Sequence, residues 1–127
     1  MNKIRIGLMG LGTVGSGVVR ILNGHGDDLS RQTGCELEIR RVLVRDKKKR
    51  RDADLAAELL TDRAEDIVDA PDIDVVIEVM GGVVETKTWI ERAIRSGKHV
   101  VTANKDLMAM HGAELVTLAK EHGCDIY

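Results

Sequence analysis

Residues 10–15 read Gly10-Leu11-Gly12-Thr13-Val14-Gly15, and this stretch decides the fold. It directly follows residues 4–9, an apolar run with the length of a buried strand. It opens residues 13–23, whose apolar side chains recur at helical spacing, and Gly24 follows that segment. A strand, a glycine turn and a helix in this order begin a βαβ unit.

Each glycine of this loop has a different chemical use. Gly10 allows the tight turn out of the strand, Gly12 lets a pyrophosphate approach the backbone, and Gly15 lets the helix pack close to the sheet. The first N–H groups of the helix then face the phosphates, and the Thr13 hydroxyl can add a donor. We therefore predict that Gly10, Leu11, Gly12, Thr13, Val14 and Gly15 bind a dinucleotide. The alternative is a loop whose glycines serve only turns and packing.

The rest of the chain repeats the alternation of strand and helix. Further strands are expected at 37–44, 73–80 and 99–102, with another beginning at 125–127. Helices are expected at 53–60, 64–70, 86–96 and 107–122, the last continuing past Gly112, and 26–34 is expected to be a polar loop. This alternation predicts a single α/β domain over 1–127, a Rossmann-type doubly wound parallel sheet with helices on both faces.

Composition excludes several other classes of protein. With a net charge of -2 and 2% aromatic residues, the chain has neither a global basic field nor stacking platforms for nucleic acid. No apolar run is long enough to span a membrane. Cys35 and Cys124 lie far apart with no metal-type spacing, so we expect two reduced thiols in a cytoplasmic protein and no metal site.

The residue after the second strand indicates which cofactor is bound. In this fold an acid there binds the 2′-hydroxyl of NAD, whereas an arginine accommodates the 2′-phosphate of NADP. The chain has Arg45 first and Asp46 next, followed by a basic stretch, 47–51, that we interpret as a solvated turn. A guanidinium matches a phosphate with two parallel hydrogen bonds. We therefore predict NADP as the preferred cofactor, with NAD still possible.

Two later segments carry more specific information. One is residues 73–82, IDVVIEVMGG, and the other is residues 97–105, GKHVVTANK, followed by His111-Gly112. Both end where a strand ends, which is the ligand-binding edge of an open α/β sheet. Together with GLGTVGSGV and VRD they resemble, in order and spacing over essentially the whole chain, the cofactor domain of homoserine dehydrogenase.

That resemblance implies an activity and further site residues. The family reduces L-aspartate 4-semialdehyde to L-homoserine with NAD(P)H, on the route to threonine, methionine and isoleucine. The resemblance places Met80 and Gly81 beside the cofactor, Thr102 and Asn104 near the nicotinamide, and Lys105 there as the catalytic lysine. An ammonium at that position can orient the substrate oxygen and stabilise charge.

The resemblance also implies that this chain is only part of the enzyme. An acid, a second lysine and the surface that forms the homodimer belong to a later domain, so we expect these 127 residues to bind cofactor without turnover. Two alternatives remain: another NAD(P)-dependent dehydrogenase acting on an amino-acid-derived carbonyl, and a stand-alone NAD(P)H-sensing module. Trp89 is expected to serve packing and His99 to be structural, and His111 is expected to lie in a turn beside Gly112 without contacting ligand.

Overall fold

The computed structural model describes residues 2–24, 26–46 and 56–127. Along the chain the elements are β1 (Asn2–Met9), α1 (Thr13–Gly24), α2 (Gly26–Thr33), β2 (Cys35–Leu43), the 3₁₀ turn η1 (Ala57–Leu59), β3 (Leu60–Thr61), α3 (Glu65–Val68), β4 (Val75–Glu78), α4 (Val84–Arg95), β5 (His99–Thr102) and α5 (Lys105–Glu121).

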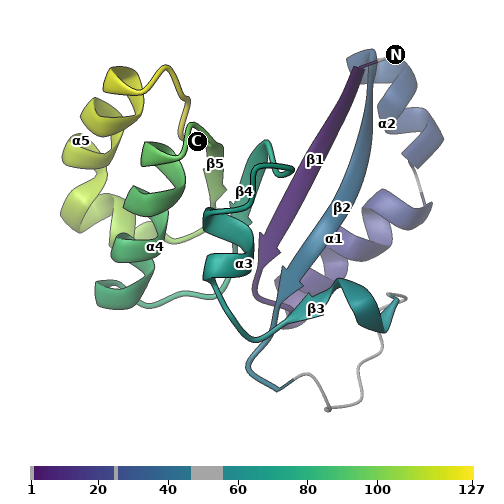
Figure 1. Ribbon diagram of the computed structural model, residues 1–127, viewed down its shortest axis with the longest axis horizontal. Helices are drawn as coiled ribbons and strands as arrows, with labels where there is room; N and C mark the ends of the chain where they lie inside the picture. The colour runs from purple at the N-terminus through teal and green to yellow at the C-terminus, as the bar shows by residue number, and fades with distance from the viewer. Residues whose placement is uncertain (1, 25, 47–55) are drawn as a thin grey trace.

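The strands within these described residues form one parallel sheet in the order β3-β2-β1-β4-β5 (Figure 1). Strand β1 lies between β2, with Leu8 beside Val42, and β4, with Leu8 beside Ile77. The chain therefore leaves β1 towards one side of the sheet and later returns to build the other side. This reversal makes the sheet doubly wound, and it confirms the predicted fold class.

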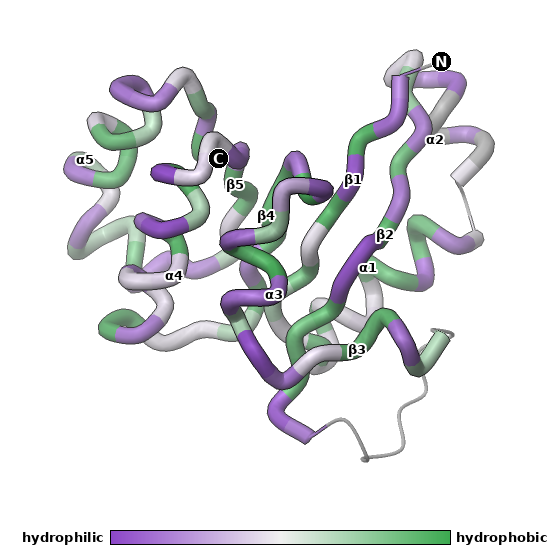
Figure 2. Tube along the Cα trace, in the orientation of Figure 1, coloured by the Kyte–Doolittle hydropathy of each residue, from purple (hydrophilic) through white to green (hydrophobic). Residues whose placement is uncertain are grey.

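Helices cover both faces of the sheet (Figure 1). On one face Leu8 and Val42 pack with Val19 of α1 in a small buried cluster. On the other face Met9 belongs to a larger cluster, formed with side chains of α3, α4 and α5. Leu8 and Met9 are neighbours on β1, so the alternation of side chains along a strand places them in the two clusters. Apolar segments accordingly run along the centre of the molecule in Figure 2.

Two predicted segments are wrong. Residues 26–34 are not a loop, because Gly26–Thr33 forms helix α2, in which Arg31 bonds Asp28 one turn earlier at 2.9 Å. A helix this short and polar has no apolar stripe that would mark it in the sequence. Residues 53–60 were expected to be a helix; 53–55 lie outside the described residues, and the remainder is a single 3₁₀ turn that leads into β3.

Other boundaries differ less. Strand β4 covers Val75–Glu78, the middle of the expected 73–80. Helix α5 begins two residues before the expected 107 and runs through Gly112, which is buried in its interior, as expected. Ile126 pairs in parallel with Val100 through an isolated bridge, which agrees with a strand beginning at 125–127.

Candidate functional site

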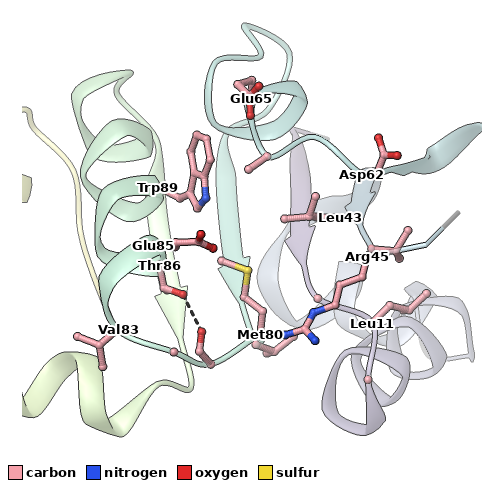
Figure 3. Close-up of a pocket in the computed structure, with 17 residues that line it drawn as sticks. Leu11, Leu43, Arg45, Asp62, Glu65, Met80, Val83, Glu85, Thr86 and Trp89 are labelled. Atoms are coloured by element: carbon pink, nitrogen blue, oxygen red, sulfur yellow. Dashed lines mark hydrogen bonds between the residues drawn. The ribbon is translucent and has the colours of Figure 1, made fainter.

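A cleft of about 770 Å³ opens at the carboxyl ends of β1, β2 and β4 (Figure 3). One wall carries the glycine loop and the segments that follow β2 and β3, and the other carries the segment after β4 and the start of α4. The lining residues are Gly10, Leu11, Gly12, Leu43, Val44, Arg45, Asp62, Ala64, Glu65, Val79, Met80, Gly81, Gly82, Val83, Glu85, Thr86 and Trp89. The cleft lies at the topological switch point between β1 and β4, where ligands bind in open α/β sheets.

The glycine loop has the geometry that its sequence predicts. Gly10 has a φ of 110°, a left-handed conformation that favours glycine, and its N–H donates to the carbonyl of Leu43 at 3.1 Å. A Cβ on Gly15 would lie 2.4 Å from the Gly10 carbonyl oxygen, so the helix can approach the loop this closely only without a side chain there. A Cβ on Gly12 would meet nothing within 4 Å. The loop is therefore closed on its protein side at Gly15 and open on its cleft side at Gly12.

Arg45 stands at the end of β2 and points towards the cleft (Figure 3). Asp46 is exposed and does not belong to the lining. Asp62, on the same side as Arg45, and Glu65, at the start of α3, also line the cleft (Figure 3). Neither carboxylate could be predicted from the sequence, because Asp62 follows the two-residue strand β3 and Glu65 begins the four-residue helix α3, and elements this short have no periodic pattern.

The opposite wall is built by the loop after β4. Gly81 and Gly82 both have a φ of 78°, and the Thr86 hydroxyl donates to the Gly81 carbonyl at 2.7 Å. Trp89 lies on this wall, one helical turn after Thr86 (Figure 3). The Arg92 guanidinium lies 5.7 Å from the centre of its ring. Its side chain packs against the larger core and also borders the cleft, a position that helical spacing alone does not reveal.

A network of hydrogen bonds lies behind this loop. Glu78 is fully buried, and one of its carboxylate oxygens accepts the N–H groups of Met80 and Gly81 at 3.0 Å each. Its other oxygen accepts the Thr102 hydroxyl at 2.6 Å. The Asn104 side chain accepts the N–H of Leu107 at 3.0 Å, which caps α5, and donates to the carbonyl of Gly82 at 2.5 Å. Thr102 and Asn104, predicted to contact the cofactor, are thus engaged with the protein.

The predicted site residues fall into two groups. Gly10, Leu11, Gly12, Arg45, Met80 and Gly81 line the cleft together. Thr13, Val14, Gly15, Thr102, Asn104 and Lys105 lie outside its lining. Thr13 and Val14 are exposed at the start of α1, and Lys105 is the exposed first residue of α5. The bond from Asn104 to Gly82 connects the position of Lys105 to the wall of the cleft.

The groups whose pKa values are shifted lie mostly near the amino ends of the strands, away from the cleft. Hydrogen bonds from the Arg5 side chain lower the pKa of Asp74, which lies just ahead of β4. Burial lowers the pKa of Lys98, whose ammonium donates to the Ala70 carbonyl at 2.5 Å.

Across 2–24, 26–46 and 56–127, no group of His, Cys, Asp and Glu side chains could hold a metal ion. No helix within these same ranges is long and apolar enough to cross a membrane.

The cleft fits a dinucleotide. Its volume lies within the usual range of cofactor sites, about 300–1,000 Å³. The open face of Gly12 leaves room for a phosphate at the start of α1, and apolar side chains such as Leu43 and Met80 border the space beyond it.

Comparison with known proteins gives the same result. The family model described as the NAD-binding domain of homoserine dehydrogenase matches residues 10–127. This chain belongs to that family. A homoserine dehydrogenase of Bacillus subtilis is 59% identical over 127 residues, which are 100% of this chain and 29% of that protein. One of Corynebacterium glutamicum is 41% identical over 126 residues, which are 99% of this chain and 28% of that protein.

Solved structures agree with the family assignment. A crystal structure of S. aureus homoserine dehydrogenase matches with a TM-score of 0.92 and 40% identity, covering 99% of this chain and 32% of that one. The chain thus spans less than a third of the length of these homoserine dehydrogenases. The resemblance stated from sequence is confirmed, and the two alternative functions are not favoured.

Proposed function

We propose that this chain is the cofactor-binding part of an enzyme that interconverts L-aspartate 4-semialdehyde and L-homoserine. The observation that carries the proposal is the cleft at the switch point, where the glycine loop meets Arg45 and the loop after β4. Family membership supports the choice of enzyme. The cofactor supplies the hydride when bound, and the residues of this chain hold and orient it.

The cofactor is a nicotinamide dinucleotide, with NADP preferred and NAD possible. The open side of Gly12 and the first N–H groups of α1 receive the pyrophosphate, because a helix N-terminus favours anions. Arg45 binds the 2′-phosphate of the adenosine ribose. The carboxylates of Asp62 and Glu65 also line the cleft and repel a phosphate, so the preference for NADP over NAD depends on how closely the Arg45 guanidinium approaches the 2′-phosphate.

The nicotinamide half extends towards the start of α5. Met80 and Gly81 contact the cofactor, and Thr102 and Asn104 shape its nicotinamide end. Lys105 is exposed, so its ammonium is free to face a bound substrate oxygen and stabilise the charge that develops there. The bond between Asn104 and Gly82 supports this arrangement, because it joins the helix that carries Lys105 to the cleft wall.

The first test is a titration with NADPH and with NADH, followed by nucleotide fluorescence or heat, on the unaltered chain and on Arg45→Ala. We expect NADPH to bind more tightly, and Arg45→Ala to remove about 1.5–3 kcal/mol of that advantage, the value of a hydrogen bond to a charged group. Arg95→Ala is the matched control, because Arg95 is an exposed arginine of α4 outside the cleft lining. Equal binding of both nucleotides, unchanged in Arg45→Ala, would refute the role of Arg45.

The complete reaction requires more than these residues. The resemblance assigns an acid, a second lysine and the dimer surface to a later part of the enzyme, and the relatives are more than three times as long as the match. We propose that the parent enzyme is a cytoplasmic homodimer joined through that part. The 127-residue chain should bind NADPH but produce no NADPH from NADP and homoserine in an absorbance assay. Measurable turnover would contradict this division of roles.

A further inference from the structure

The strand next to the cleft contains one buried charged residue. Within β4, Val76 and Glu78 point to the same face and are both fully buried. Strands of a parallel sheet covered on both faces are normally apolar throughout. Burying a carboxyl group costs free energy unless hydrogen bonds satisfy it, so its presence requires an explanation.

The partners of Glu78 show what it holds. Both of its oxygens accept: one takes the N–H groups of Met80 and Gly81, and the other takes the Thr102 hydroxyl. The Thr102 oxygen in turn accepts the N–H of Asn104 at 3.0 Å, which leaves its hydrogen for Glu78. One side chain therefore joins the cleft loop to the segment that leads into α5.

The loop needs such support. Gly81 and Gly82 adopt consecutive left-handed conformations, and glycine loses more conformational freedom on ordering than any other residue. Met80 and Gly81 both line the cleft, so any movement of their backbone changes its wall. Glu78 itself does not line the cleft and cannot contact a ligand there.

We propose that Glu78 is a positioning residue that sets the Met80–Gly82 loop against the cofactor and, through Thr102 and Asn104, sets the start of the helix that carries Lys105. This rests on the proposed function and adds to it a residue that acts from behind the cleft. A glutamine amide at this position would keep one acceptor oxygen and replace the other with an NH₂ group, which only donates. If its oxygen faced Met80 and Gly81, its NH₂ would meet Thr102, whose hydrogen would then lose its acceptor.

The experiment compares Glu78→Gln with Asp74→Asn in the 127-residue chain. Both changes turn a carboxylate into an amide, at the two ends of the same strand region, and Asp74 bonds Arg5 far from the cleft. Affinity for NADPH and thermal unfolding are measured at a temperature where every variant is folded. We expect Glu78→Gln to bind NADPH about tenfold more weakly, and Asp74→Asn to bind it as the unaltered chain does.

Amide exchange gives a second readout. In Glu78→Gln the amide protons of Met80 and Gly81 should shift in NMR spectra and exchange faster with solvent, whereas Asp74→Asn should leave them unchanged. Equal affinity in the two variants, or unchanged amides of Met80 and Gly81, would show that Glu78 serves only stability and would overturn the proposal.

A pair of Thr102 variants covers the case in which Glu78→Gln does not fold. Thr102→Ser keeps the hydroxyl that Glu78 accepts, so without nucleotide the amide protons of Met80 and Gly81 should exchange as in the unaltered chain, whereas Thr102→Val should make them exchange faster. Equal exchange in the two variants would overturn the proposal. If the unaltered chain bound neither NADPH nor NADH, the proposed function would be contradicted independently of Glu78. Hydrogen exchange of the Met80 and Gly81 amide protons would then still show whether Glu78 holds the loop.

Discussion

Gly12 and Gly15 of the glycine loop both act by lacking a side chain, but the space that this leaves borders different neighbours. A side chain on Gly15 would strike the backbone oxygen of Gly10, which cannot move away as a flexible side chain can. A side chain on Gly12 would enter open space on the cleft side. The two positions lie three residues apart in one motif; the structure gives Gly15 a packing role and leaves Gly12 open, as the proposed binding role requires.

Alanine substitutions separate these roles. Gly15→Ala should destabilise the chain by about 1–3 kcal/mol through overpacking and lower its Tm. Gly12→Ala should leave the free energy of unfolding within about 0.5 kcal/mol, yet weaken NADPH binding about tenfold by filling the phosphate approach. Thermal unfolding and NADPH titration of both variants check this. A normal Tm for Gly15→Ala, or normal affinity for Gly12→Ala, would contradict the assignment.

At the scale of elements, the two ends of the parallel sheet have different functions. The carboxyl ends of the strands form the cleft, and the amino ends carry ion pairs. Arg5 of β1 donates to both carboxylate oxygens of Asp74, at 3.1 and 3.0 Å, and so joins β1 to the start of β4. The hydrogen bonds lower the pKa of Asp74.

The lowered pKa has a consequence for stability at low pH. The unfolded pKa of an aspartate is about 4, so the stabilisation is complete above that pH and is lost as pH falls through the lower folded value. Asp74→Asn should therefore lower the Tm at pH 7, and its difference from the unaltered chain should shrink below about pH 4. Since Asp74 is partly exposed, the effect should be modest. A Tm difference that stayed constant from pH 7 to pH 3 would count against this ion pair.

The whole molecule has a buried cluster on each face of a shared sheet. Val19 belongs to the cluster on the α1 face, and Trp89 packs against the cluster on the other. Because β1 contributes Leu8 to one cluster and Met9 to the other, the two should melt together.

Trp89 is the single tryptophan of the chain, so its fluorescence reports unfolding from one face only. Val19→Ala, on the opposite face, should destabilise by about 2 kcal/mol and lower the Tm that Trp89 reports. Ile21→Ala is the matched control on the same helix, because Ile21 is 53% exposed and should have little effect. A Trp89 transition unaffected by Val19→Ala would mean that the two faces unfold independently.

The fold class and the side of the cleft formed by the glycine loop and Arg45 could be predicted, because their sequence signals are local. Residues 4–24 contain a strand, a glycine turn and a helix within a short stretch, and the structure shows why Gly10, with its left-handed φ, and Gly15, with no room for a side chain, must be glycine. Arg45 could be placed at the cleft because it directly follows a recognisable strand. Helix α2, strand β3 and the carboxylates Asp62 and Glu65 could not, because short polar elements lack periodic patterns.

The sequence by itself determined the alternation of elements, the phosphate loop and the resemblance to homoserine dehydrogenase, since motif and periodicity are properties of neighbours along the chain. Only the tertiary structure decided that Trp89 borders the cleft, that Thr102 and Asn104 face the protein, and that Glu78 bonds Thr102, 24 residues away. The contacts of Glu78, Thr102 and Asn104 arise where β4 and β5 lie side by side in the sheet. Their pairing depends on packing between distant segments, which no local pattern encodes.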